Sequence, residues 1–98
     1  MKTLEDMTYL IQQALPELRR QYGVRDLWLF GSYIRAEQGA ESDLDVLVEF
    51  DNPRLTLIEF IQLEQQLSQL LGIKVDLVER DTLKPEIGKR ILQEAVAL

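Results

Sequence analysis

The sequence contains neither cysteine nor histidine. Without cysteine there is no disulfide, no thiolate nucleophile and no sulfur ligand for a metal. Without histidine, a Ser-His-Asp triad, a histidine-ligated zinc and a histidine base are all excluded. Any chemistry is left to carboxylates, Ser, Tyr, Lys, Arg, the backbone and a metal with oxygen ligands.

The chain is also short of basic residues, with 11 Lys and Arg against 17 Asp and Glu and a net charge of −6. This balance argues against a broad basic face, so we expect no direct nucleic-acid partner. No run of about 20 apolar residues is present to span a membrane, and the N-terminus lacks a signal-peptide profile. A cytoplasmic location is therefore expected. The 98 residues, of which 46% are hydrophobic, predict a single domain over residues 1–98.

The distribution of apolar residues predicts an α/β domain with a small mixed sheet packed against helices. Strands are expected at 24–30, 43–50 and 73–78, where apolar and β-branched residues concentrate. Helices are expected from the cap Thr3 to about Gln13, from Pro16 to Gly23 with Leu15 extended before it, at 33–37, at 55–71, and from Pro85 onward. In the helix at 55–71, Leu57, Ile58 and Ile61 widen the apolar surface, which suggests a surface for a partner.

Two aspartates lie two residues apart in the expected strand 43–50. Strand side chains alternate between faces, so Asp43 and Asp45 share one face and Leu44 and Val46 the other. Two like charges held close repel each other unless a cation lies between them or one carboxyl takes up a proton. A hard divalent cation with oxygen ligands, above all magnesium, resolves that repulsion.

A third aspartate, Asp76, lies between Val75 and Leu77 in the expected strand 73–78. Burying an aspartate in an apolar strand is costly without a partner or a metal. If the two strands are neighbours, Asp76 completes a three-carboxylate site, the equipment for two metal ions that clamp a phosphoryl transfer. Structural explanations remain open: Asp45 pairs with a basic side chain, and Asp76 pairs with Lys74 or lies at a solvated edge.

The strand 24–30 ends at Gly31, and Ser32 is a suitable cap for the short helix expected at 33–37. Backbone N–H groups at such a strand-to-helix turn favour an anion, so the turn is a candidate phosphate site. The structural alternative is an ordinary helix cap, with Arg35 a solvated helix residue.

Taken together, these residues form one spaced pattern: Gly31-Ser32, ten residues, Asp43-Leu44-Asp45, and later Val75-Asp76-Leu77. The pattern resembles that of the minimal nucleotidyltransferases of the DNA polymerase β superfamily, and the resemblance extends over almost the whole chain. It implies the polymerase β-like nucleotidyltransferase fold. The family usually has glycine after the arginine of the turn, where this chain has Ala36.

The resemblance also implies roles at the matching positions. Asp43 and Asp45 would hold the metals, and Asp76 would bind the catalytic metal and help to deprotonate the acceptor hydroxyl. Ser32 would contact the β- and γ-phosphates of a nucleoside triphosphate, and Gly31 would let the backbone come close. Arg35 would pair with phosphate oxygens.

The implied reaction is magnesium-dependent transfer of AMP from ATP to a hydroxyl. Small stand-alone chains of this kind are similar to the antitoxin of HEPN–nucleotidyltransferase toxin–antitoxin pairs, so the implied acceptor is a tyrosine of a HEPN ribonuclease toxin. One alternative is an antitoxin that neutralises its partner by covering it, without catalysis. A small-molecule nucleotidyltransferase is a weaker alternative, because 98 residues leave little chain for a second domain.

Overall fold

The computed structural model describes residues 3–39, 43–51 and 55–98. Its elements follow in the order α1 (Leu4–Tyr22), β1 (Val24–Phe30), β2 (Leu44–Phe50), α2 (Leu57–Leu71), β3 (Val75–Glu79), the 3₁₀ turn η1 (Arg80–Thr82), α3 (Pro85–Glu94) and β4 (Val96–Ala97).

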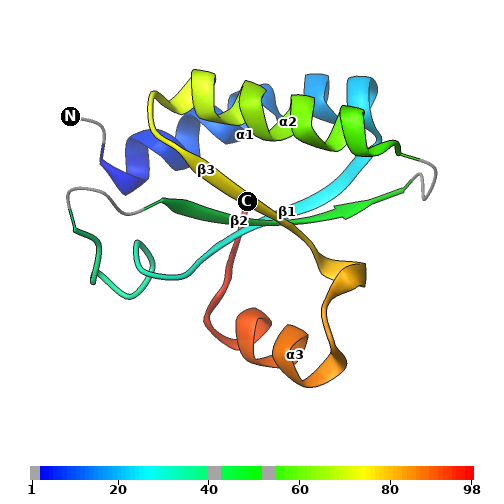
Figure 1. Cartoon of the computed structure of the whole chain (residues 1–98). Helices are drawn as coiled ribbons and strands as arrows, with labels where there is room; N and C mark the ends of the chain where they lie inside the picture. Colours follow the sequence, from blue (N-terminus) through cyan, green and yellow to red (C-terminus); the bar gives the residue numbers. More distant parts are fainter. Residues whose placement is uncertain (1–2, 40–42, 52–54) are drawn as a thin grey trace.

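The four strands form one mixed sheet in the order β3-β2-β1-β4. β1 is antiparallel to both β2 and β4, whereas β2 and β3 run parallel. The α1 and α2 helices lie together over one face of the sheet, and α3 lies on the other side (Figure 1). The expected α/β class with a small mixed sheet is confirmed.

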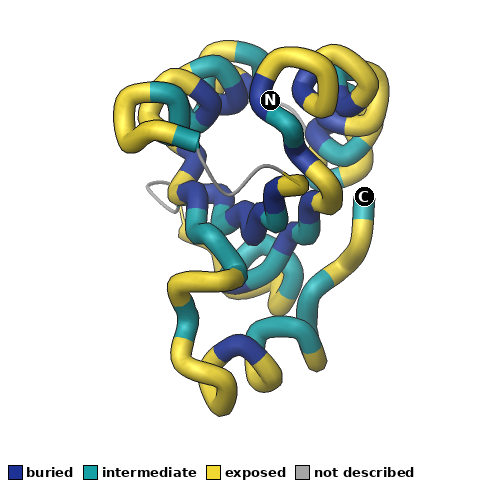
Figure 2. Tube along the Cα trace, turned by 90° about the vertical axis from the view of Figure 1, so that its right-hand side faces the viewer, coloured by how far each residue is buried: buried dark blue, intermediate teal, exposed yellow. Residues whose placement is uncertain are grey.

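The hydrophobic core fills the space between the sheet and the pair α1 and α2 (Figure 2). The core side chains of the two helices recur at helical spacing: Met7, Ile11, Leu15 and Leu18 on α1, and Leu63, Leu67 and Leu71 on α2. Alternate residues of β2 meet them, namely Leu44, Val46, Val48 and Phe50. No charged side chain is fully buried among the residues that the structure describes. The side chains of β2 that point the other way are therefore the ones available for polar chemistry.

One helix, α1, replaces the two short helices expected around Pro16, and Leu15 is helical rather than extended. The reason is the continuous buried stripe of this helix, which runs past the proline to Leu18 and Tyr22. Pro16 is exposed and removes one backbone donor from the helix, a cost that burial of the stripe outweighs.

The segment expected as a short helix at 33–37 forms a series of turns instead. The N–H of Arg35 donates to the C=O of Gly31 at 3.1 Å, but that of Glu37 donates to the C=O of Ser32 at 2.8 Å, so the helical spacing is not kept. Ala36 interrupts it with a left-handed φ of 57°. This conformation costs a residue with a Cβ about 1–2 kcal/mol, a cost that glycine would avoid.

Three further differences concern short elements and element ends. The two-residue β4 and the turn η1 are too short to leave a pattern in the sequence, and α2 begins at Leu57 after the capping residue Thr56.

Leu57, Ile58 and Ile61 of α2 are exposed, by 73%, 69% and 43%, as their excess over one apolar stripe suggested. Within the described ranges, none of the helices has the length and apolar character needed to cross a bilayer.

Replacing Pro16 by alanine restores the missing backbone donor in the middle of α1. We expect Pro16→Ala to raise the free energy of unfolding by about 1–3 kcal/mol, measured by urea denaturation. Gln13→Ala, at another exposed position of α1, is the control and changes stability by less than about 0.5 kcal/mol. A Pro16→Ala protein that is less stable than the original would contradict this account of α1.

Candidate active site

The strand register brings the three predicted aspartates to one place, and we call Asp43, Asp45 and Asp76 the aspartate cluster. Asp45 is the register partner of Asp76 in the parallel pair of β2 and β3. Register partners in neighbouring strands project from the same face, with backbones about 5 Å apart. Asp43 precedes β2 by one residue and lies two residues from Asp45, which gives it the same face.

The aspartate cluster lies on the face of the sheet opposite to α1 and α2. The neighbouring residues Leu44 and Val46 point into the core beneath those helices. Alternation along the strand therefore directs Asp43 and Asp45 to the side on which α3 lies (Figure 1). The cluster belongs to the more open side of the molecule, where a ligand has room to approach.

Gly31 and Asp45 approach each other more closely than any other residue type would allow at position 31. A Cβ built on Gly31 would lie 1.9 Å from Oδ2 of Asp45. Gly31 also has a left-handed φ of 82°, which independently favours glycine. The turn after β1 is thus shaped around the carboxylate of Asp45. The last residue of β1, Phe30, is the register partner of Asp45, so the turn begins directly beside this aspartate.

The charges of the aspartate cluster act on one another. Partial burial raises the pKa of the Asp45 carboxyl, and repulsion from Asp76 and then Asp43 raises it further. Arg35 counters the shift, and Glu94 adds weakly to it. Negative charge therefore accumulates at Asp45 beyond what the nearby cation offsets, and this is the electrostatic condition that a divalent cation relieves.

The three carboxylates of the aspartate cluster do not point at one common metal position in this structure. Oδ2 of Asp43 lies 3.7 Å from Nζ of Lys74, so Lys74 is the partner of Asp43 and not of Asp76. Over residues 3–39, 43–51 and 55–98, no three carboxylates are placed as ready metal ligands. The Lys74 side chain is largely exposed and that of Asp43 is 38% exposed, so solvent screens this ion pair and the aspartate is available to change partners.

The remaining predicted residues, Ser32 and Arg35, lie in the turn that follows β1. Ser32 is half-buried directly after Gly31. The Arg35 guanidinium is held by two glutamates: Nε donates to Glu37 at 3.2 Å, and Nη1 donates to the two carboxylate oxygens of Glu94 at 3.1 and 3.0 Å. Sequence reasoning missed Glu94, which is 59 residues away from Arg35 and has no place in the aspartate pattern.

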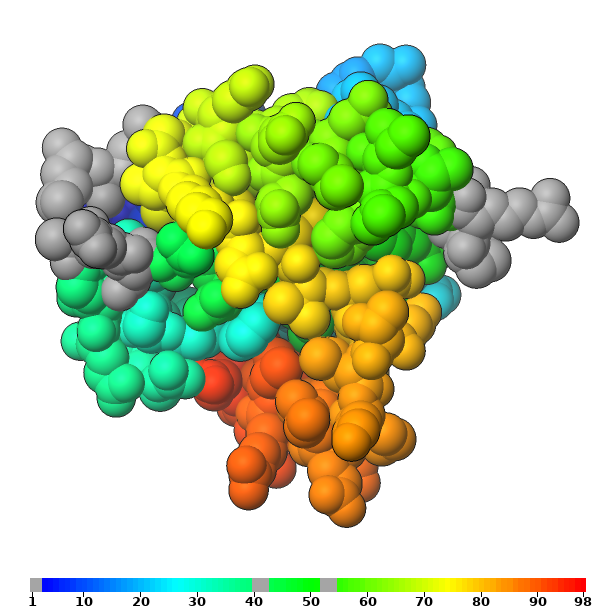
Figure 3. Space-filling model, viewed as in Figure 1, coloured from blue at the N-terminus to red at the C-terminus, as the bar shows by residue number. Residues whose placement is uncertain are grey.

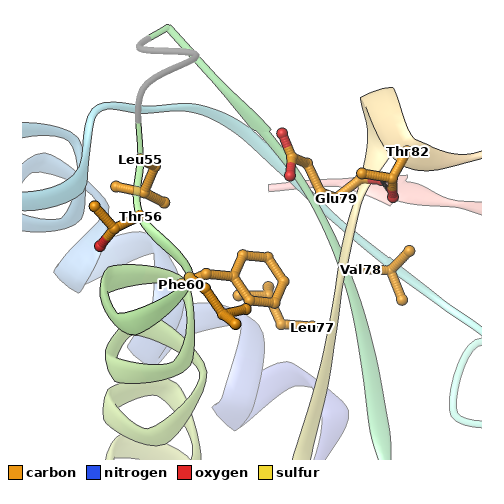
Figure 4. A pocket seen from close by; sticks show the side chains of 8 residues that line it. Leu55, Thr56, Phe60, Leu77, Val78, Glu79 and Thr82 are labelled. Atoms are coloured by element: carbon orange, nitrogen blue, oxygen red, sulfur yellow. Dashed lines mark hydrogen bonds between the residues drawn. The ribbon is translucent and has the colours of Figure 1, made fainter.

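A separate hollow of about 400 Å³ lies between the start of α2 and the end of β3 (Figure 4). Its lining is mainly apolar: Leu55, Leu57, Phe60, Leu77 and Val78, with Thr56, Glu79 and Thr82 as the polar members. None of the predicted site residues lines it. The aspartate cluster and this hollow are distinct features, and only the first has the donors for phosphate and metal chemistry.

The mixed sheet with a glycine-serine turn beside paired aspartates fits the nucleotidyltransferase pattern that the sequence resembles, and comparison with known proteins agrees. The pattern of the nucleotidyltransferase domain family matches residues 11–98. The chain is 44% identical over 96 residues to the protein adenylyltransferase MntA of Thermococcus cleftensis, covering 98% of this chain and 96% of that protein.

Two solved structures are similar over most of the chain. One is a presumed minimal nucleotidyltransferase, with a TM-score of 0.84 and 34% identity, covering 99% of this chain and 97% of the other. The second belongs to a toxin–antitoxin complex crystallised with AMP-PNP, with a TM-score of 0.70 and 25% identity over 88% of this chain and 70% of the other. The chain therefore belongs to the nucleotidyltransferase family, and the predicted family and fold are confirmed.

Gly31→Ala tests the close approach of the turn to Asp45. We expect it to lower the free energy of unfolding by at least about 1–2 kcal/mol, because alanine is strained at this φ and its Cβ displaces the carboxylate. Gly88→Ala in α3 is the matched control, since a Cβ there makes only an ordinary contact at 3.9 Å with Leu83. The control gains about 1 kcal/mol of helix propensity in the same denaturation experiment. Equal effects of the two substitutions would refute the description of the turn.

Asp45→Asn tests the electrostatic cost of the aspartate cluster. Because the pKa of Asp45 is raised in the folded protein, its ionisation destabilises the fold at neutral pH. We expect the uncharged isostere to be more stable at pH 7, by up to about 1 kcal/mol after allowing for solvent screening. The difference shrinks as the pH falls through the raised pKa, and it vanishes below about 4, the pKa of an unfolded aspartate.

The measurement is thermal and urea unfolding of both proteins between pH 3 and pH 8, roughly the range over which carboxyl groups titrate. Asp26→Asn, at an exposed aspartate of β1 outside the aspartate cluster, is the control and shows no comparable gain. A loss of stability in Asp45→Asn at neutral pH would show that the cluster is not under repulsion.

Proposed function

We propose that the protein is a magnesium-dependent protein adenylyltransferase of the cytoplasm, acting as a single minimal nucleotidyltransferase domain of residues 1–98. It moves AMP from ATP to a hydroxyl of a partner toxin, a tyrosine of a HEPN ribonuclease, and so neutralises the toxin. The observation that carries the proposal is the register of Asp45 with Asp76 beside the Gly31 turn. That arrangement collects oxygen ligands next to a turn suited to phosphate.

The relatives support the substrate and the partner. The Thermococcus protein, with 44% identity over nearly its whole length, is named a protein adenylyltransferase. The structurally similar toxin–antitoxin complex was crystallised with AMP-PNP, a nucleotide analogue. A HEPN toxin as the partner follows from the resemblance of the sequence motif to the antitoxins of HEPN–nucleotidyltransferase pairs.

The proposed roles are those that the resemblance to minimal nucleotidyltransferases implies at these positions, and the chemistry of the side chains fits them. Gly31 and Ser32 accommodate the triphosphate through the close backbone of the turn, and Arg35 pairs with phosphate oxygens. The carboxylates of the aspartate cluster fit a magnesium ion, because they are oxygen donors whose mutual repulsion a cation offsets. When bound, magnesium offsets the negative charge of the phosphates and polarises the phosphorus that is attacked.

In the transfer step, the acceptor hydroxyl attacks the α-phosphorus in line with the leaving group. A new oxygen–phosphorus bond forms to AMP, the bond between the α-phosphorus and the bridging oxygen breaks, and pyrophosphate leaves with that oxygen. Asp76, the exposed member of the aspartate cluster, accepts the proton of the attacking hydroxyl. Its exposure suits this role, since a macromolecular acceptor must reach it from outside.

A second function, neutralisation by covering the toxin without catalysis, is favoured by two observations. Among the described residues, no three carboxylates stand ready as metal ligands, and Arg35 is engaged by glutamates. Catalysis requires these side chains to change partners, whereas covering a partner does not. The two functions differ in whether the aspartates are needed.

The test is transfer of label from ATP labelled at the α-phosphate to a purified candidate HEPN toxin, with magnesium. We expect labelled toxin carrying the mass of an added AMP, no transfer after chelation of magnesium, and at least about a 100-fold loss in Asp45→Asn and Asp76→Asn. Asp26→Asn, at an exposed aspartate of β1 outside the aspartate cluster, keeps full activity. Toxin inhibition that survives Asp45→Asn without any label transfer would establish the covering function instead.

A further inference from the structure

Glu94 faces the candidate site although it lies outside the aspartate motif. It is the last residue of α3, and both of its carboxylate oxygens accept from Nη1 of Arg35 at 3.1 and 3.0 Å. Its negative charge also reaches Asp45, whose pKa it helps to raise. A single side chain thus touches the proposed phosphate ligand and influences the proposed metal ligand.

The position of Glu94 is fixed by the strand that follows it. In β4, Val96 pairs with Leu29 and Ala97 with Trp28, and the N–H of Leu98 donates to the C=O of Leu27 at 3.0 Å. The C-terminal segment is therefore attached to the last part of β1, just before the turn that carries Arg35. Figure 3 shows the turn after β1, in cyan to teal, directly beside the red and orange atoms of this segment.

Glu94 is the less exposed of the two carboxylates that hold Arg35. Glu37 makes one contact, at 3.2 Å, from a side chain that is 65% exposed. Glu94 uses both oxygens and is 30% exposed, so solvent screens its attraction to the guanidinium less. The Arg35–Glu94 pair also links two segments far apart in sequence, which Glu37 does not.

Carboxylate and phosphate oxygens compete for the same donors of an arginine, because both groups present two charged oxygen acceptors at a spacing that fits the guanidinium N–H groups. A nucleoside triphosphate that takes Nη1 of Arg35 displaces Glu94 from that nitrogen. The displaced carboxylate then stays near Asp45 and adds to the negative charge that already surrounds it. Both effects work against nucleotide binding.

We propose that Glu94 is a residue of the nucleotide site: it occupies Arg35 in the nucleotide-free protein, in the place of a phosphate, and the triphosphate replaces it. This inference rests on the proposed function, which assigns Arg35 to phosphate. In this role Glu94 lowers the affinity of the site for nucleotide. Nucleotide binding also breaks the Arg35–Glu94 ion pair, which joins the turn after β1 to the C-terminal segment.

The experiment is titration calorimetry with AMP-PNP and magnesium on the full chain. Glu94→Gln keeps the shape of the side chain and removes its charge, and we expect a Kd about three- to tenfold lower than that of the original protein. In an Arg35→Gln background the same substitution has a clearly smaller effect, because the ion pair is already gone. Glu86→Gln, at an exposed glutamate in the first turn of α3, leaves the Kd unchanged.

The outcomes separate this inference from the proposed function. If the original protein binds no AMP-PNP, both fail. If it binds, and Arg35→Gln weakens binding while Glu94→Gln leaves the Kd unchanged or raises it, the inference alone fails. A raised Kd would mean that Glu94 positions Arg35 for phosphate instead of competing with it. Thermal unfolding of each variant establishes that it is folded before the titration.

Discussion

The contact between the Asp45 carboxylate and the backbone of Gly31 is the constraint on which the site depends. With no Cβ at position 31, the end of β1 closes onto the side chain of β2 at a distance that every other residue would block. The same carboxylate is in register with Asp76 on the opposite flank. A central strand thus presents Asp45 between a tight turn on one side and a second aspartate on the other.

That arrangement has an electrostatic cost, which the surrounding side chains reduce only in part. Lys74 lies beside Asp43, and Arg35 lowers the pKa of Asp45 while it is itself held by Glu37 and Glu94. The positively charged side chains of Arg35 and Lys74 are therefore already paired with carboxylates. Perturbed charges of this kind gather at functional sites, where a ligand supplies the compensation. This is the physical basis on which we propose a magnesium nucleotide as the ligand of these oxygen donors.

The sequence predicted the fold class and the three long strands, because strand alternation and short-range motifs carry that information. The register places Asp45 beside Asp76, while a shared metal site of all three aspartates stays a prediction. It was wrong about Pro16, since the buried stripe that holds α1 together extends further than local propensity suggests. It was wrong about residues 33–37, where the left-handed Ala36 breaks the helical spacing.

The contacts that the sequence could not predict are those made across long separations. Glu94 reaches Arg35 only because the two-residue β4 attaches to β1, and a strand that short leaves no recognisable pattern. Lys74 pairs with Asp43 instead of Asp76 because the register of β2 and β3 sets Leu44 opposite Val75, and these are the residues that follow Asp43 and Lys74. Motif spacing predicts which residue types gather, whereas side-chain partners are decided by the register of the assembled sheet.

The central claim, that repulsion among the three aspartates is relieved by a divalent cation, is tested most directly by the titration of Asp45 itself. Carboxyl carbon resonances in NMR, followed against pH with and without magnesium, report its pKa in both states. The account predicts a pKa above that of an ordinary aspartate without magnesium, and a lower pKa when magnesium is present. An Asp45 that titrates normally and does not respond to magnesium would contradict it.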